Sequence, residues 1–270
     1  MAPYVDEIHI AEGTRDFSGA RKKLLWPSLA KSGDALIAKF LHKITYHAVE
    51  VPPNATSYDI QKSVLAAQLK VPGRGVMLEG DLDEIVRREV LQAVRACEPA
   101  DGSGWNANVQ MKIFVYSLAW GGSTDWANPP LMREFGLTGS GPATSLAQVA
   151  ARVHGMGQVG HKRYIRNAEN HIVMTDGRTA GWHLGWACDG AEGIAEKILH
   201  GHIEGTPAAF APYAGNRDTL VEFLRDKSLP NPKAYQPDLV RSNLKWDGLP
   251  QAIRDDPDLF RSWLGDLELA

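Results

Sequence analysis

The stretch that decides the predicted fold runs from Gly80 to Val153. It opens as Gly80-Asp81-Leu82-Asp83-Glu84, continues through the nearly uncharged run Val109 to Trp120, and closes as Thr144-Ser145-Leu146-Ala147-Gln148-Val149-Ala150-Ala151-Arg152-Val153. At the first of these, Asp81 resembles an N-cap, and Glu84 is placed to reach back to the cap amide. The run from Val109 alternates like a strand at first, but its length favours a buried helix. Together the three segments predict a mostly α-helical protein.

Capping residues and apolar spacing predict more helices on both sides of this stretch. They are expected over residues 34–45, 57–69, 128–135, 191–200, 219–227 and 259–267. Residues 46–51 read as a short strand or an extended linker. The part from 161 to 188 is the least helical, and its Asp176-Gly177 turn indicates a small β-hairpin or a long loop.

These elements predict a two-lobed helical core. Residues 1–30, which Pro27 interrupts, are expected to form an N-terminal arm. An N-terminal helical lobe is expected over 31–155 and a C-terminal lobe over 156–270. The content of strongly apolar residues is sufficient for one large core or for two lobes that share a cleft.

Composition limits the classes of partner. The 270 residues carry a net charge of −3, so an interaction with nucleic acid would need a local basic patch. The two cysteines, Cys97 and Cys188, lack the spacing of a zinc site and indicate a reduced, intracellular protein. No basic and apolar leader and no run of about 20 apolar residues is present, so we expect a cytoplasmic protein without a membrane partner.

Several short motifs point to chemistry only weakly. His47-Ala48-Val49-Glu50 is one residue longer than the deaminase pattern and lacks its Cys-x-x-Cys partner. His200-Gly201-His202 with Glu204 has donors for a metal, although histidines are common at helix ends. Gly155-Met156-Gly157-Gln158-Val159-Gly160 spells a dinucleotide fingerprint but follows a predicted helix instead of a strand. We therefore predict no metal and no cofactor.

One enzymatic interpretation stays open. Cys188 directly precedes a predicted helix start, where the helix dipole lowers a thiol pKa, and His171 and His183 are near it in the sequence. These residues define a cysteine-dependent hydrolase as the alternative function. The simpler alternative is that Cys188 packs in the interior. Cys97, on the apolar stripe of its helix, is expected to be buried.

The densest group of basic and aromatic residues is 160–167. Cations that neutralise phosphates beside a ring that stacks on a base are typical of proteins that bind single strands. An ordinary solvated edge would have the same composition. The predicted RNA-binding residues are Lys112, Trp120, Arg133, Arg152, Lys162, Arg163, Tyr164, Arg166 and Arg178.

The order of the motifs between residues 57 and 155, with Glu222-Phe223-Leu224-Arg225 later in the chain, resembles the nucleoproteins of phlebovirus-like and tenuivirus-like segmented RNA viruses. The resemblance implies a non-enzymatic nucleocapsid protein of the cytoplasm and the virion, which coats single-stranded RNA of any sequence and forms homo-oligomers. It also implies that the arm docks on a neighbouring subunit. The docking residues would be Phe17, Leu24, Leu25 and Trp26.

The chain departs from that family at two places. The family has arginines just after the central apolar run and early in the small-residue helix, where this chain has Trp120 and Gln148. If the resemblance holds, either RNA is held mainly by stacking, or its phosphates are contacted by Arg152, Lys162, Arg163 and Arg166.

Overall fold

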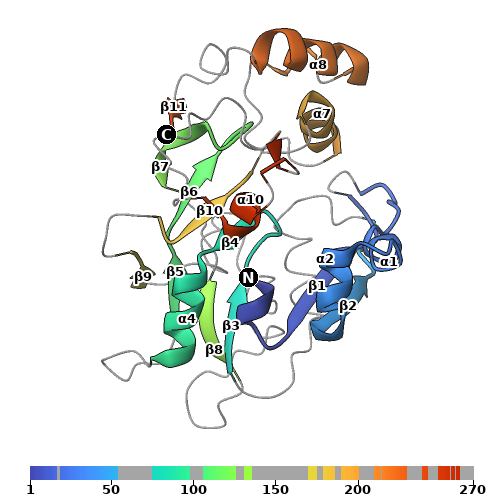
Figure 1. Cartoon of the computed structure of the whole chain (residues 1–270). Coiled ribbons are helices and arrows are strands. Elements are labelled where there is room, and N and C mark those ends of the chain that lie inside the picture. Colours follow the sequence, from blue (N-terminus) through green and yellow to red (C-terminus); the bar gives the residue numbers. More distant parts are fainter. Residues whose placement is uncertain are drawn as a thin grey trace, which may run out of the picture. The chain divides into compact units, whose positions relative to one another are not determined.

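Figure 1 shows the computed structural model of the chain. It describes residues 1–16, 19–53, 75–97, 106–125, 131–135, 170–174, 179–185, 190–200, 210–213, 215–229, 239–242, 249–255, 257–258 and 260–261. The chain divides into two compact units, each assembled from several stretches of sequence. Unit 1 contains residues 1–78, 91–106 and 132–167, and unit 2 contains 79–90, 107–131 and 168–270. The predicted lobe boundary at residue 155 does not coincide with this division.

In unit 1, a parallel pair of strands forms the base of the N-terminal part. Strand β1 (Ile8–Gly13) pairs with β2 (Ile44–Val49) in a register that runs from Ile8 opposite Ile44 to Gly13 opposite Val49. The connection between them carries the short helices α1 (Trp26–Leu29) and α2 (Ala35–Phe40) and the 3₁₀ turn η2 (Leu41–Lys43). A further 3₁₀ turn, η1 (Ala2–Tyr4), precedes β1.

The start of α2 confirms the predicted cap. The Asp34 carboxylate accepts hydrogen bonds from the backbone amides of Leu36 (2.8 Å) and Ile37 (3.1 Å), which satisfies amides that a helix start leaves unpaired. Before it, Gly33 has a φ of +76°, a conformation in which a side chain is strained. The helix is shorter than predicted, because the chain has already become a strand at Ile44.

Unit 2 contains a mixed five-stranded sheet in the order β11-β7-β6-β10-β4. These strands are β4 (Glu84–Val86), β6 (Met111–Phe114), β7 (Trp120–Asp125), β10 (Gly181–His183) and β11 (Leu239–Arg241). Only the β6–β10 pair is parallel, and the other three are antiparallel. A further sheet has the order β3-β8-β5-β9, from β3 (Gly75–Glu79), β8 (Leu131–Phe135), β5 (Asn106–Val109) and β9 (Asn170–Ile172).

Helices cover the five-stranded sheet and create two apolar clusters. Helix α7 (Gly190–His200) and helix α8 (Arg217–Phe223), which continues as the π-helical turn η4 (Leu224–Ser228), pack with Ile113, Val115 and Trp120. The second cluster joins Phe114 and Trp182 to Leu249 and to Ile253 of α10 (Gln251–Asp255). Neighbouring residues of β6 therefore enter different clusters, as strand alternation requires.

The prediction of a mostly helical fold is wrong. The described residues contain eleven strands, β1 to β11, and no described helix is longer than α7. The decisive error lies in the run from Val109 to Trp120, which forms the end of β5, all of β6 and the start of β7. The alternation of Val109, Met111 and Ile113 was the informative signal. The run is long because it crosses from β5 through β6 and a turn into β7.

Of two other predicted helices, the one expected from Asp81 to Cys97 begins with a strand and is helical only as α4 (Arg88–Ala96), and the other is a strand. The hydrogen bond expected at Asp81 is present, because the Glu84 carboxylate accepts from the Asp81 amide at 2.6 Å. It closes a turn into β4, and α4 begins only later. Residues 131–135, expected to be helical after two prolines, form β8. In both cases pairing with strands distant in the sequence outweighed a local helix signal.

Two of the remaining predicted helices are confirmed. The helix expected over 191–200 is confirmed as α7, and the helix after Asn216 as α8, whose cap is a hydrogen bond from the Thr219 amide to Asn216 Oδ1 at 3.1 Å. The expected hairpin near residue 176 does not form between the described strands there, because β9 pairs with β5 and β10 with β6. Residues 57–69, 144–153 and 262–267 lie outside the described part. Among the described helices, none is long and apolar enough to cross a bilayer.

Candidate functional site

Three of the nine predicted RNA-binding residues fall in the described part of the chain. Lys112 lies on β6, Trp120 begins β7, and Arg133 lies on β8. The other six, Arg152, Lys162, Arg163, Tyr164, Arg166 and Arg178, lie outside the described residues. The basic and aromatic group at 160–167 therefore stays a prediction.

Trp120 forms a cation–π pair with an arginine that the sequence did not indicate. Strand β11 is an edge strand of the five-stranded sheet, and its Arg241 lies directly opposite Trp120 of β7. The Arg241 Cζ lies over the indole, 5.2 Å from the ring centroid. Trp120 is half-buried against the α7–α8 cluster, whereas Arg241 is exposed. The pair presents an exposed, planar cation backed by an aromatic ring, and a planar cation of this kind can stack on a base.

Lys112 does not belong to this pair. A Cβ built on Gly121 would lie 3.5 Å from Lys112 Cε and 3.8 Å from a ring carbon of Phe114, so these side chains share one face of the sheet. Trp120 is the next residue along the strand and packs in the opposite cluster. Successive side chains of a β-strand point to opposite faces of the sheet. Lys112 and Trp120 therefore lie on opposite faces and cannot both contact an RNA bound to one of them.

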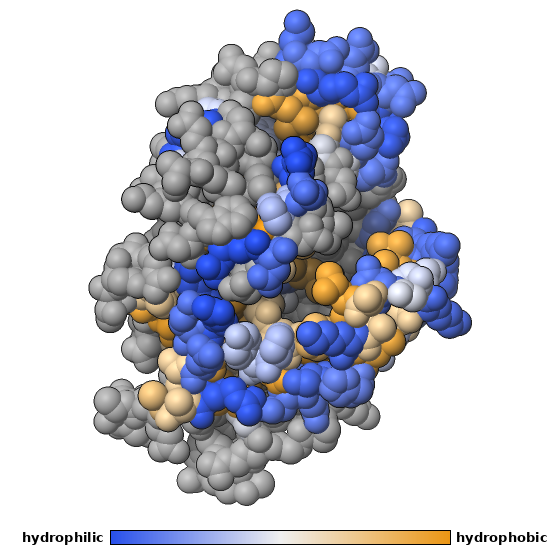
Figure 2. Space-filling view, viewed as in Figure 1, coloured by the Kyte–Doolittle hydropathy of each residue, from blue (hydrophilic) through white to orange (hydrophobic). Residues whose placement is uncertain are grey.

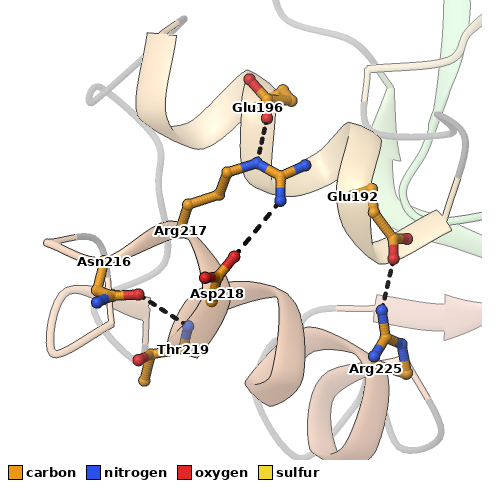
Figure 3. Close-up of polar contacts among 7 residues, drawn as sticks. All are labelled: Glu192, Glu196, Asn216, Arg217, Asp218, Thr219 and Arg225. Carbon is orange, nitrogen blue, oxygen red and sulfur yellow. Dashed lines mark hydrogen bonds and ion pairs between the residues drawn. The ribbon is translucent and has the colours of Figure 1, made fainter.

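Two described arginines beside α7, Arg217 and Arg225, pair with carboxylates, as Figure 3 shows. Arg217 Nε lies 2.5 Å from Glu196 Oε1, and its Nη1 lies 3.6 Å from Asp218 Oδ1. Arg225 pairs with Glu192. A hydrogen bond from its own backbone amide and the pairing with Arg225 lower the pKa of Glu192, and the bond to Glu196 raises the pKa of Arg217. These neutralised cations offer little attraction to phosphate.

A second polar cluster lies at the end of β10. Asp83 Oδ2 accepts from Lys197 of α7 at 2.8 Å, and Asp83 Oδ1 lies 3.7 Å from Nε2 of His183. Lys197 also donates to the carbonyl of Gly185. Burial alone would raise the pKa of Asp83, but the charges of Lys197 and His183 outweigh it, and the pKa is lowered.

The imidazole of His183 is held in place by this cluster. Its side chain is only 8% exposed, and a Cβ at Gly185 would lie 3.0 Å from His183 Cε1, so the ring packs on the glycine backbone. The Leu184 amide donates to the Asp83 carbonyl at 2.8 Å, which fixes the strand end beside the carboxylate. Cys188 lies outside the described residues, and so does the side chain of His171. Cys97, which we expected to be buried, is exposed.

The described residues of the predicted arm belong to unit 1 and contact its strand pair. Glu12 of β1 accepts hydrogen bonds from the backbone amides of Leu25 (2.8 Å) and Trp26 (3.2 Å) and from the hydroxyl of Tyr46 (2.9 Å). This carboxylate ties the start of α1 to the strand pair. Leu24 and Trp26 are half-buried, Leu25 is exposed, and Phe17 lies outside the described residues.

The Glu12 contacts shift two pKa values. Burial alone would raise the pKa of Glu12, but the hydrogen bonds from Leu25, Trp26, Tyr46 and Lys22 together lower it. Burial and then the Glu12 carboxylate raise the pKa of Tyr46 to about 12. Both shifts favour the charged carboxylate beside the neutral phenol at neutral pH.

The histidine motif at residue 47 has a different environment from the one its sequence suggested. His47 Nε2 lies 3.0 Å from Nδ1 of His9 on the neighbouring strand, and His9 Nε2 lies 3.2 Å from Glu7. Burial and the charge of His9 lower the pKa of His47. The described residues include no group of three or more His, Cys, Asp or Glu side chains arranged for a metal ion.

No family model, no curated protein and no solved structure matches the chain.

The functional candidates that sequence reasoning missed share one property. Arg241 and Lys197 acquire their roles from partners far away in the chain, namely Trp120 and Asp83. Arg241 stands in a short strand without a local motif, and Lys197 reads as an ordinary exposed position of a helix. Glu12 gave no signal, because residues 1–30 were interpreted as an arm.

Proposed function

We propose that this protein is a nucleoprotein that coats single-stranded RNA without sequence specificity, forms homo-oligomers through its N-terminal part, and catalyses no reaction. The proposal starts from the order of sequence motifs and from the basic residues at 160–167. It implies a ribonucleoprotein of the cytoplasm and of a virion. Its RNA surface in unit 2 includes Trp120 and Arg241.

The observation that carries the proposal is the stacked pair at the edge of the five-stranded sheet. An exposed arginine over a half-buried indole offers a flat cationic surface on which any base can stack. The contact reads no base edge, and this agrees with binding of any sequence. The overall charge of −3 requires such a local site, because the whole molecule does not attract phosphate.

The test is the binding of a labelled RNA oligonucleotide by purified, nucleic acid-free protein over a range of salt concentrations. Trp120→Ala should weaken binding roughly tenfold to a hundredfold, the worth of about one stacked base. Arg241→Gln should reduce the slope of log affinity against log salt by about one. Trp120→Phe keeps a ring and should restore most of the affinity.

Arg225→Gln is the matched control for Arg241→Gln, because it also removes an exposed arginine from unit 2, but one that lies beside Glu192 and not over Trp120. It should leave the salt slope unchanged. Wild-type protein that binds no RNA at low salt would refute the proposed function, and equal effects of the two arginine substitutions would refute the assignment of the surface.

A second candidate function is a cysteine-dependent hydrolase, and the environment of His183 favours it. A nucleophilic thiol needs a base, and the base needs a group that orients it. His183 is buried beside the carboxylate of Asp83, and Cys188 follows it closely in the sequence, just before α7. In this candidate Cys188 is the nucleophile, His183 the base and Asp83 the orienting group.

Alkylation by iodoacetamide as a function of pH tests this candidate. Because Cys97 is exposed, the experiment uses a Cys97→Ser background in which Cys188 is the only thiol. An activated Cys188 reacts well below the ordinary thiol pKa of about 8.5, and His183→Gln returns it to that value. A thiol that is inert, or that titrates normally with and without His183, removes the hydrolase from consideration.

A further inference from the structure

The N-terminal part exposes an apolar surface. Leu25, which caps α1, and leucines of α1, α2 and η2 are accessible to solvent, and Figure 2 shows hydrophobic residues gathered over this part of the molecule. They are Leu25 (61% exposed), Leu29 (47%), Leu36 (59%) and Leu41 (37%), which we call the leucine surface. Several large apolar side chains close together on a surface are typical of an interaction site.

The leucine surface lies in basic surroundings. Residues 21–43 contain six lysines and arginines and one acidic residue, Asp34. Arg21 and Lys22 pair with Glu50 and Glu12, so the surplus positive charge comes from the other lysines. The Asp34 carboxylate is already used to cap α2, and Lys31 and Lys39 are exposed. A partner that buries these leucines must therefore be apolar, and acidic residues in it would be attracted.

One segment of the same chain has that composition. Residues 262–270 contain Trp263, Leu264 and Leu267 at helical spacing, with Asp266 and Glu268 beside them and no basic residue. Phe260, just before the segment, packs against the unit 2 cluster that contains Phe114 and Trp182. The segment thus starts from a fixed point in unit 2.

We propose that the leucine surface of one copy binds residues 262–270 of a second copy. Trp263, Leu264 and Leu267 cover the leucines, while Asp266 and Glu268 face Lys31 and Lys39. Two different complementary surfaces on one chain join copies head to tail, and such contacts repeat along a row. The inference deepens the oligomerisation part of the proposed function and rests on that part alone.

The test is sedimentation velocity of RNA-free full-length protein over a wide range of concentrations. Leu36→Glu should weaken self-association about tenfold or more, and so should the charge reversals Lys31→Glu with Lys39→Glu. Asp266→Lys with Glu268→Lys should weaken it similarly. An equimolar mixture of the two reversed proteins should associate again, because their altered surfaces are complementary. Leu36 is exposed, so thermal unfolding of these variants should match the wild type.

Three results would overturn the inference: a wild type that stays monomeric, reversals without effect, or reversed proteins that do not recover when mixed. A labelled peptide of residues 262–270 covers one more arrangement. The peptide is added to the wild type and to a protein that lacks residues 262–270. If both proteins are monomers and the peptide binds only to the shortened one, residues 262–270 dock within their own copy. Binding of a short RNA is measured on the same samples. A wild type that self-associates but binds no RNA refutes the RNA role and leaves this inference standing.

Discussion

Residues 1–53 and the α7–α8 part of unit 2 are stabilised by different forces. In the first region, the buried apolar side chains among the described residues are Val49 and Val51. Its connecting segments are held by hydrogen bonds. The Glu12 carboxylate accepts from the amides of Leu25 and Trp26, and Arg15 Nε donates to the Val51 carbonyl at 3.0 Å. The stability of this region therefore depends on charges.

The α7–α8 part has an apolar interior and places its charges at the rim. Ile194, Leu220 and Leu224 are almost completely buried, and Phe223 packs on Tyr213 with ring centroids 4.0 Å apart. The π-helical turn brings Ser228 into the interior, where its hydroxyl donates to Tyr116. Stability here comes from apolar area and close packing. Substitutions and pH should therefore act differently on the two regions.

Ile194→Ala tests the apolar side of this comparison and should have the largest effect. Ile194 is 1% exposed and belongs to the α7–α8 cluster, and its truncation removes apolar contacts and leaves a cavity. The expected loss of stability is about 2–5 kcal/mol. Hydrogen exchange measured by mass spectrometry on peptides from α7 and α8 reports it, and Leu36→Ala, at an exposed site, should change stability by less than about 0.5 kcal/mol. Equal losses for the two variants would contradict the comparison.

Glu12→Gln tests the polar side. The amide keeps the shape of the side chain but removes the charge that two backbone amides, Tyr46 and Lys22 all face. We expect a loss of about 1–3 kcal/mol, visible as faster exchange of the amides of residues 25 and 26.

Glu50→Gln is the matched control for Glu12→Gln. Glu50 also pairs with a cation, Arg21, at 3.2 Å, but both side chains are mostly exposed. Its loss should cost about 0–1 kcal/mol. If the two substitutions accelerate exchange equally, the carboxylate of Glu12 does not anchor α1.

The pH dependence of the β1–β2 pair gives a third, smaller effect. Because the pKa of His47 is lowered in the folded protein, its contribution is complete above the unfolded value of about 6.5 and is lost as pH falls through the folded pKa. His9 lies 3.0 Å away on β1, and Glu7 faces His9. Exchange of the β1 and β2 amides, corrected for intrinsic rates, should therefore accelerate between neutral pH and about pH 5.

His47→Gln removes the group that titrates and should flatten this pH profile. Glu12, whose pKa is also lowered, adds a second loss only below its unfolded value of about 4.3, so the two steps are separable. A profile that is unchanged in His47→Gln would show that another group is responsible.

The sequence predicted elements whose stability is local. Asp34 and Asn216 cap helices that begin where expected, because a cap is a contact between residues two or three positions apart. The segment from Asp81 to Glu84 shows the limit of this reasoning. Its hydrogen bond forms, but β4 pairs with β10 nearly a hundred residues later, and that partner decides the conformation.

The candidate sites follow the same rule. Trp120 was identified from its own surroundings, but its partner Arg241 was not, because antiparallel pairing of β7 with β11 creates the contact. His183 was identified beside Cys188, whereas Asp83 and Lys197 come from other elements. A single sequence gives residue types and local spacing. Which strand lies next to which depends on the packing of the whole sheet.

Arg225→Gln should have the smallest effect. It tests whether an exposed ion pair contributes to the stability of the apolar α7–α8 part. Arg225 of η4 pairs with Glu192 of α7, as Glu12 pairs with its partners in the N-terminal region, but both side chains are more than half exposed. Water and salt screen such a pair, and ordering two long side chains costs entropy. We expect no measurable change in the exchange of α7 and α8 peptides at physiological salt and at most a slight one at low salt. A loss comparable to that of Ile194→Ala would mean that the rim charges, and not the buried side chains, hold these two helices together.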